Sequence, residues 1–332
     1  MVEHWSPKPG VGGSSPSAPA KFRCLTMDFE SVEKARLTYA AKLKRGLIIC
    51  VIFLSAVITI GMASGGGFGA VGITFFAAIF VVITYYILNY FLYKTERANY
   101  RKAYKGYFVE RNMKKIFTDL RYDHDSGMPS LVLASTGMIR TGDRYYSNDF
   151  TDAKYHDVGF SQADVTIQEE HTDSDGDSYY VTIFKGRWMV FEFPKKFAYR
   201  IEVVQKGFTA KKVPKSGPNG RRFEKQKIES STFHKKFKIY AEDGFETFYV
   251  LDPALIDHIE TISNNCKGKL LLCFVDNKLH VGLHDNKDAF EPPSPLKKIN
   301  EQEETKKIYN ELKTITNFID YLKLDKKIFT NK

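Results

Sequence analysis

Two uncharged apolar runs stand next to each other in this chain, at residues 46–64 and 68–93, with only Gly65, Gly66 and Gly67 between them. A helix needs about 20 apolar residues to cross a hydrocarbon core of about 30 Å. Both runs reach that length, so the sequence predicts a transmembrane helical hairpin. Buried helices of a soluble domain and a cleaved signal peptide are the alternatives. Paired charge-free runs are rare in soluble domains, and a signal peptide is shorter and nearer the start.

Basic residues flank the hairpin on both sides, whereas the connecting loop carries no charge. The positive-inside rule therefore places both chain ends in the cytoplasm. A loop this short cannot form a domain, so we expect function on the cytoplasmic side. The flanking residues are Lys42, Lys44 and Arg45 before the first run, and Lys94, Arg97, Arg101, Lys102 and Lys105 after the second.

The formal net charge of +10 agrees with this placement. Each basic residue near an anionic leaflet contributes about 1 kcal/mol of attraction. Nucleic acid is the other partner of basic chains, but the charge gathers beside the spans and no recognition motif accompanies it. We expect the lipid bilayer as a partner and no nucleic acid. The four cysteines, Cys24, Cys50, Cys266 and Cys273, suit a reducing compartment and form no disulfide framework.

The amino-terminal segment differs from the rest of the chain. Residues 1–21 are rich in Pro, Gly and Ser and lack a hydrophobic period, so residues 1–26 are predicted to be disordered. Our hypothesis is that this segment is not native and that translation starts at Met27. The alternative is a genuine flexible tail. Endogenous peptides from upstream of Met27, detected by mass spectrometry, would refute the hypothesis.

Amphipathic stripes lead into and out of the hairpin. We expect the two helices to pack into a cytoplasmic stalk, so that residues 27–122 form one helical unit. The spans or the stalk also offer contacts for an oligomer or a partner helix. The stripe residues are Phe29, Val32, Arg36, Tyr39 and Leu43, then Tyr100, Tyr104, Phe108, Met113, Ile116 and Leu120.

After Asp123 the apolar period changes towards two, which indicates strands. Residues 123–332 are therefore predicted to form a cytoplasmic α+β domain of mainly antiparallel sheet with a long C-terminal helix. Helices are predicted at 253–264, where Asp252 is the cap, and at 301–322. The predicted strands are 131–139, 163–168, 179–185, 187–193, 199–204, 225–229, 237–241, 247–251, 269–275 and 278–283.

The order of these segments resembles a known family. A two-span hairpin is followed by IFKGRWMVFEFPKKF at 183–197, by the tract at 229–258, and by LLLCFVDNKLHVGLHDNKDAFE at 270–291. This is similar to bacterial two-span membrane proteins known only as a domain of unknown function, number three-one-three-seven. The resemblance covers residues 27–330. It implies a bacterial inner membrane and an uncharacterised cytoplasmic domain, and it supplies no catalytic residues.

Gly67, Gly69 and Gly72 match the GxGxxG spacing of a dinucleotide site. That site needs a preceding strand and a soluble βαβ unit, which a membrane helix does not provide. We predict no cofactor here, and we expect these glycines to bring the two spans close together.

Asp173, Asp175 and Asp177 alternate like the first ligands of an EF-hand loop. The glycine falls at position 4 instead of 6, and Phe184 stands where a bidentate glutamate is required. We predict a solvated acidic turn between two strands and no calcium site.

Cys266, Cys273, His280 and His284 have the ligand types of a zinc site but not its spacing. Cys273 lies within a strand and is expected to be buried. The two histidines alternate with Leu279, Val281 and Leu283, so we expect them to face water. We predict no metal site.

No nucleophile elbow, P-loop, HExxH or kinase motif occurs in the sequence. The prediction is a membrane-anchored interaction or scaffold module with an unknown protein partner. An enzyme acting on a membrane-associated substrate and a lipid-surface sensor that uses basic loops are the alternatives. The residues predicted to contact anionic lipid are Lys42, Lys44, Arg45, Lys94, Arg97, Lys211, Lys212, Arg221 and Arg222.

Overall fold

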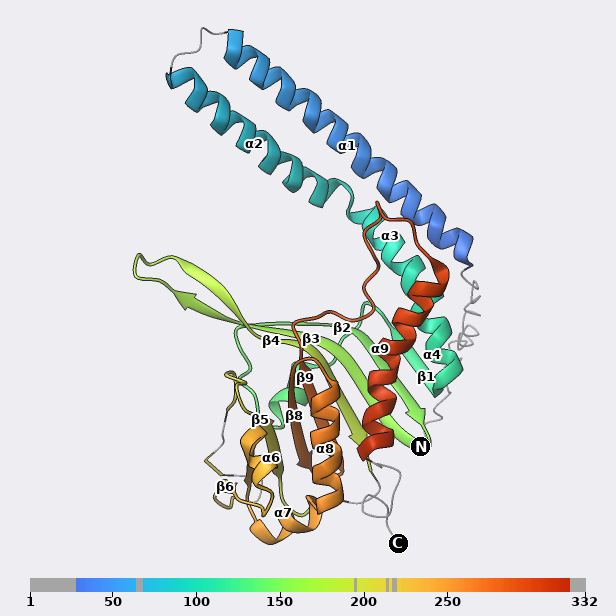
Figure 1. The fold of residues 1–332 in the computed structure, drawn as a ribbon, viewed down its shortest axis with the longest axis vertical. Coiled ribbons are helices and arrows are strands. Elements are labelled where there is room, and N and C mark those ends of the chain that lie inside the picture. Colours follow the sequence, from blue (N-terminus) through green and yellow to red (C-terminus); the bar gives the residue numbers. More distant parts are fainter. Residues whose placement is uncertain (1–27, 64–67, 194–195, 213–214, 217–219, 323–332) are drawn as a thin grey trace, which may run out of the picture.

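The computed structural model describes residues 28–63, 68–193, 196–212, 215–216 and 220–322. The predicted disordered segment, the proposed start at Met27 and the glycine turn between the apolar runs lie outside these residues. Within them, a long pair of helices projects from a domain built on one β-sheet (Figure 1).

The projecting pair consists of α1 (Phe29–Ala63) and α2 (Phe68–Leu92), which lie side by side. By length and composition, the segments Phe29–Gly61 and Thr74–Leu92 could each cross a membrane. Gly61 permits a close approach, because an added Cβ would lie 2.3 Å from Thr74 Oγ1. Gly72, which was expected to serve this purpose, has nothing within 4 Å of its Cβ position.

Three short helical segments follow α2: α3 (Lys94–Tyr104), a π-helix η1 (Lys105–Glu110) and α4 (Arg111–Ile116). Of these, α3 and η1 pack against the first half of α1, as the stripes predicted. Tyr39 and Tyr100, for example, have ring centroids 6.5 Å apart. The predicted stripe is wrong at its end, because the backbone becomes extended at Phe117 and Leu120 lies in strand β1 (Thr118–Asp123).

Within the part of the chain that the structure describes, nine antiparallel strands form the sheet, in the order β1-β2-β3-β4-β9-β8-β5-β7-β6. This confirms the mixed helix and antiparallel-sheet prediction. The remaining strands are β2 (Arg144–Tyr155), β3 (Val158–Thr172), β4 (Ser178–Glu192), β5 (Ile201–Gln205), β6 (Glu224–Gln226), β7 (Phe237–Ala241), β8 (Lys269–Val275) and β9 (Lys278–His284). The remaining helices are α5 (Ser130–Ala134), α6 (Ser231–Lys236), α7 (Gly244–Val250), α8 (Pro253–Asn265) and α9 (Glu301–Leu322).

Two predicted strands are wrong. The segment 131–139 contains α5 instead, and the Thr136 hydroxyl donates to the Leu133 carbonyl at the end of that helix. The segment 247–251 lies largely in α7, whose start is capped because Asp243 accepts a hydrogen bond from the Glu246 backbone N–H at 2.9 Å. In α7 this local cap outweighs the strand propensity of an apolar run.

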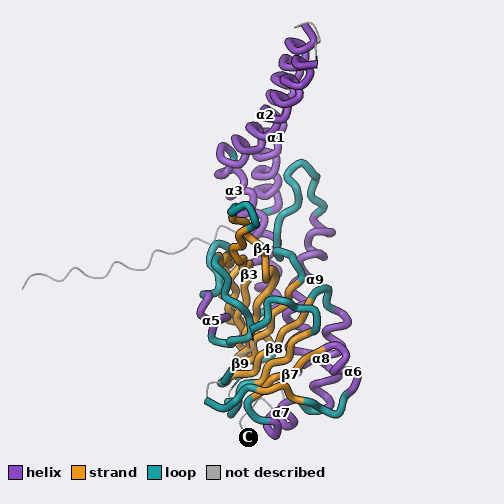
Figure 2. Tube along the Cα trace, turned by 90° about the vertical axis from the view of Figure 1, so that its left-hand side faces the viewer, coloured by secondary structure: helices purple, strands orange, loops and turns teal. Residues whose placement is uncertain are grey.

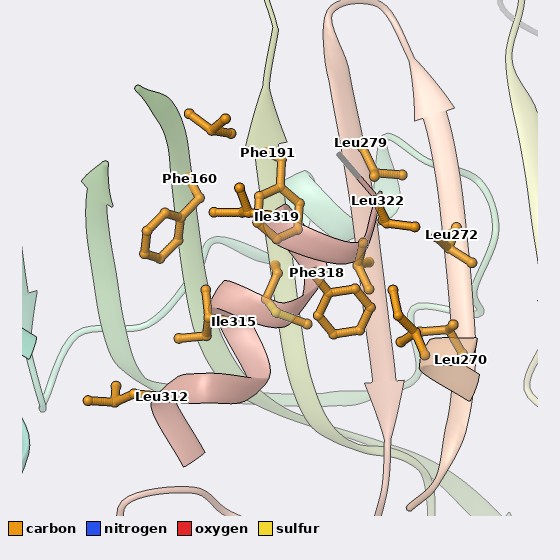
Figure 3. Packing of buried hydrophobic residues seen from close by; sticks show 14 of the residues in the cluster. Phe160, Phe191, Leu270, Leu272, Leu279, Leu312, Ile315, Phe318, Ile319 and Leu322 are labelled. Atoms are coloured by element: carbon orange, nitrogen blue, oxygen red, sulfur yellow. The ribbon is translucent and has the colours of Figure 1, made fainter. Parts of the chain in front are cut away.

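Helices cover one face of the sheet, and a loop with α5 covers the other (Figure 2). On the helical face, the buried side of α9 packs against Phe160, Phe191 and Leu272 (Figure 3). The apolar face predicted for α9 is confirmed, since Ile308, Leu312, Ile315, Ile319 and Leu322 are buried. Successive side chains of strand β8 are buried alternately in the cores on the two faces of the sheet, which explains why its apolar run is unbroken.

Candidate functional site

A cavity of about 710 Å³ lies between α8, α9, the loop 285–291 and the adjoining strands. Groups of both charge signs line it, together with asparagines, Thr314, Tyr321 and apolar side chains such as Phe318. We call it the charged cavity. Its ionisable lining includes Asp164, Arg187, Lys267, Lys287, Asp288, Lys307 and Glu311.

Asp164 and Arg187 stand opposite each other on β3 and β4 and form the sheet side of this cavity. An Asp164 carboxylate oxygen lies 3.8 Å from Arg187 Nε, and the other accepts a hydrogen bond from the Ala289 backbone N–H at 2.5 Å. Arg187 Nη1 donates to the Glu311 carbonyl at 2.9 Å. These two side chains therefore attach the loop 285–291 and α9 to the sheet.

A buried ion pair lies in the same region of the domain. The Lys105 ammonium, which is fully buried, donates to Asp149 Oδ2 at 2.6 Å and lies 3.1 Å from a Glu291 oxygen. Tyr122 donates to the other Asp149 oxygen at 2.6 Å. We call Lys105, Asp149, Tyr122 and Glu291 the Lys105 cluster.

Irregular backbone positions both members of this ion pair. Lys105 begins the π-helix η1, a rare conformation that is frequent at functional sites. Asp149 has a φ of 57° at an interruption of the β2–β3 register. Lys105 was counted among the basic flank of the hairpin, but the structure places it inside the domain.

Burial raises the pKa of several acids in this region. It holds the pKa of Asp164 well above its usual range, with Arg187 partly offsetting the shift and a hydrogen bond to Asp288 adding to it. Burial also raises the pKa of Asp149, while Lys105 lowers it. A carboxyl group whose pKa is raised at a cavity wall can act as a general acid or base.

Among the described residues, Asp149, Asp288 and Glu291 could hold a metal ion, because their ligand atoms lie within 4.8 Å of one another. The Lys105 ammonium already supplies a positive charge to two of these carboxylates. A metal ion would therefore compete with an internal cation, and the donor set does not fit a resident metal.

The residues predicted to contact lipid fall into two separate groups. Lys42, Lys44, Arg45, Lys94 and Arg97 gather at the base of the helical pair. Lys42 pairs with Glu96, and the Arg97 guanidinium lies over the Tyr90 ring. The charges of Lys44, Arg45 and Lys94 are exposed.

The second group lies between β5 and β6, at the other end of the domain (Figure 1). The Lys211 ammonium lies over the Tyr240 ring, and burial lowers the pKa of Lys211 to about 7. Arg221 pairs with Asp243 and Arg222 pairs with Glu224, both at 3.2 Å. The structure thus does not bring the two basic groups together. Lys212, Arg221 and Arg222, all exposed, are called the loop cations below.

The Cys and His pattern does not form a metal group among the described residues. Cys273 is buried as predicted and stands opposite His280 in the β8–β9 pair. The expectation that His280 faces water is wrong: it is only 2% exposed, and burial lowers its pKa to about 4. The loop with α5 covers this sheet face, which strand alternation could not reveal. His284 is half-buried.

The acidic alternation at Asp173, Asp175 and Asp177 forms the exposed turn between β3 and β4, as predicted. The sequence reasoning missed the Lys105 cluster. A signal was present for Lys105, because it stands among the aromatic residues Tyr104, Tyr107 and Phe108 of its helix. Asp164, which belongs to the charged cavity and not to this cluster, likewise stands within an apolar strand. Charged residues at such positions are buried only when they are paired.

Comparison with known proteins agrees with part of the sequence resemblance. A family model described as "Protein of unknown function (DUF3137)" matches residues 182–324, from β4 to α9. The resemblance is confirmed over that segment. No curated protein matches the chain. One similar solved structure is the crystal structure of the mycobacterial trehalose monomycolate transport factor A, TtfA. The two chains are 10% identical, and the match covers 68% of this chain and 93% of the TtfA chain with a TM-score of 0.34.

Proposed function

We propose that this chain is a membrane-anchored interaction module. In this proposal α1 and α2 cross a bacterial inner membrane, and both chain ends and the sheet domain lie on its cytoplasmic side. The carrying observation is that large apolar side chains on both helices are mostly exposed. Phe53, Ile60, Phe76, Phe80 and Phe91 are between 61% and 72% exposed. Lipid chains would bury this surface.

The base of the helical pair has the composition of a membrane interface. Tyr85, Tyr86, Tyr90 and Tyr93 follow one another along the last turns of α2 and just beyond it. Tyrosine is enriched where hydrocarbon meets headgroups, because its ring is apolar and its hydroxyl is polar. The exposed basic residues next to them would then contact anionic headgroups.

Side-chain contacts join the anchor to the sheet domain, which supports a scaffold role. Arg36 of α1 donates to the Pro295 carbonyl at 2.8 Å, and Tyr100 of α3 donates to the Pro293 carbonyl at 3.1 Å. The Lys105 cluster adds a buried link to β2. A domain held in this way would present the same surfaces at a fixed distance from the bilayer.

Partner capture in native membranes tests the module function. Crosslinking of the tagged full chain, followed by mass spectrometry, should recover specific proteins that a hairpin-only chain (residues 27–122) does not recover. Recovery of the same proteins by both chains, or of none by either, would contradict a role for the sheet domain in binding partners. Reporter fusions after residue 332 test the topology separately, and a periplasmic carboxy terminus would contradict it.

An enzyme acting on a membrane-associated substrate is the second candidate, because Asp164 and Asp288 share the wall of the charged cavity. Purified chain should then consume a component of a lipid and metabolite extract that Asp164→Asn and Asp288→Asn variants leave unchanged. Identical extracts after all three incubations would remove the enzymatic proposal.

A further inference from the structure

Helix α7 exposes three aromatic side chains at the end of the domain that lies opposite α1 and α2 (Figure 1). Phe245 is 84% exposed, Phe248 is 54% exposed and Tyr249 is 55% exposed. Thr247 and Val250 of the same helix are buried, which holds α7 against the domain. Clustered exposed aromatics on a soluble surface are typical of a binding site, whereas single ones are ordinary.

A groove of about 560 Å³ runs beside these aromatics, between α7, α8 and the start of α6. Phe248, Leu251 and Ile256 supply apolar surface, and Glu229, Asp257 and Glu260 supply carboxylates. We call this the α7 groove. None of the described residues that line it is Lys, Arg or His, although the chain as a whole carries a net charge of +10.

One carboxylate oxygen in the groove has no hydrogen-bond partner among the described residues. Glu260 Oε1 is buried and accepts no hydrogen bond from any described residue. A buried acceptor without a donor is unfavourable, and a cationic donor restores more of that loss than a neutral one. The groove therefore combines an apolar surface with an unsatisfied negative group.

We propose that the α7 groove binds a peptide segment of a partner protein in which Lys or Arg stands beside a large apolar residue. This rests on the proposed interaction function and names the chemistry of the partner. The apolar side chain covers Phe248 and Leu251, and the cation pairs with Asp257 and Glu260. The same carboxylates repel nucleic acid and anionic headgroups, which leaves a protein segment as the occupant.

Peptide binding to the full chain tests this proposal. The chain is placed in phosphatidylcholine nanodiscs, with empty nanodiscs as the blank. The probe is a fluorescein-labelled octapeptide that alternates lysine with leucine and phenylalanine, and its counterpart carries glutamate in place of lysine. Fluorescence anisotropy should show saturable binding of the lysine probe and at least tenfold weaker binding of the glutamate probe.

Variants test whether the lysine probe binds in the α7 groove. Asp257→Lys with Glu260→Gln should weaken binding of the lysine probe at least tenfold, and Phe248→Ser should also weaken it. The control reverses two exposed charges elsewhere, Asp175→Lys with Asp177→Lys in the β3–β4 turn, and should leave binding unchanged. Fluorescence of the buried Trp188 reports that each variant is folded.

Three results would overturn the proposal: no saturable binding of the lysine probe, equal binding of both probes, or equal loss in the control variant. The last would show that general charge attraction and not the groove holds the probe. Crosslinked partners recovered from membranes alongside any of these results would leave the interaction function standing and remove only this groove. Absence of crosslinked partners together with specific binding of the lysine probe in the groove would remove the proposed interaction function and keep the groove as a binding site.

Discussion

Replacement of Lys105 by methionine removes the buried charge that balances Asp149 while keeping a side chain of similar length. The side chains of Lys105 and Asp149 are 0% and 1% exposed, so water cannot replace the lost ammonium without rearrangement. Loss of one member of a buried ion pair typically costs 3–5 kcal/mol. The hydrogen bonds from Tyr122 and Asn148 to Asp149 remain, which places our expectation at the lower end, about 3 kcal/mol.

The loss should depend on pH. Without Lys105, the pKa of Asp149 rises further in the folded chain, so the folded state binds a proton that the unfolded state does not. A carboxyl with a raised folded-state pKa stabilises the fold less as pH rises. The difference between wild type and Lys105→Met should therefore be larger at pH 8 than at pH 5.

Urea unfolding of the detergent-solubilised full chain measures this effect. A Trp5→Phe background leaves Trp188 as the sole tryptophan reporter, since the chain has two tryptophans. Addition of Asp149→Asn should recover most of the stability lost in Lys105→Met, because the unpaired charge is then absent. A single variant within 1 kcal/mol of wild type, or a double variant that loses the sum of both single losses, would refute the ion-pair reasoning.

Three further changes test other parts of the structure. Burial raises the pKa of Glu202 to about 8, so the stability that Glu202 contributes falls as pH rises from about 4.5 to 8. Over that range the stability of Glu202→Gln relative to wild type should therefore rise by up to about 1.4 kcal/mol per pH unit. Parallel pH profiles of the two proteins in urea unfolding would contradict this. Phe318→Ala should cost about 3–5 kcal/mol in the same assay, because Phe318 is fully buried under the sheet, whereas a loss below 1 kcal/mol would show that its packing is dispensable. Reversal of the loop cations to glutamate should weaken binding of nanodisc-held chain to phosphatidylserine vesicles, and unchanged sedimentation would remove a lipid role for that loop.

Elements with a strong local pattern were predictable from the sequence. Helix α9 has the predicted bounds because its apolar residues recur at helical spacing, and the β8–β9 hairpin is marked by Asp276 and Asn277 between two apolar runs. The two strands predicted at 179–185 and 187–193 are one strand in the structure, β4, which continues through Gly186 with a φ of 150°.

Elements that depend on distant contacts were not predictable in this way. Strand β2 was missed because its residues RYYSNDFTDAKY mix charge with aromatics and break the alternation at Asp149. The Lys105 cluster joins residues from η1, β1, β2 and the loop before α9, so no spacing in the sequence links them. The position of His280 likewise depended on which segments cover each sheet face.

The side of the membrane on which the sheet domain lies tests the central claim most directly. Asp175→Cys places a thiol in the exposed β3–β4 turn, in a background where the native cysteines are replaced by serine or alanine. In intact spheroplasts, an impermeant maleimide should leave this thiol unlabelled, and it should label the thiol after lysis, with the chain remaining in the carbonate-washed membrane fraction. Labelling before lysis, or release of the chain into the soluble fraction, would contradict a cytoplasmic domain anchored by α1 and α2.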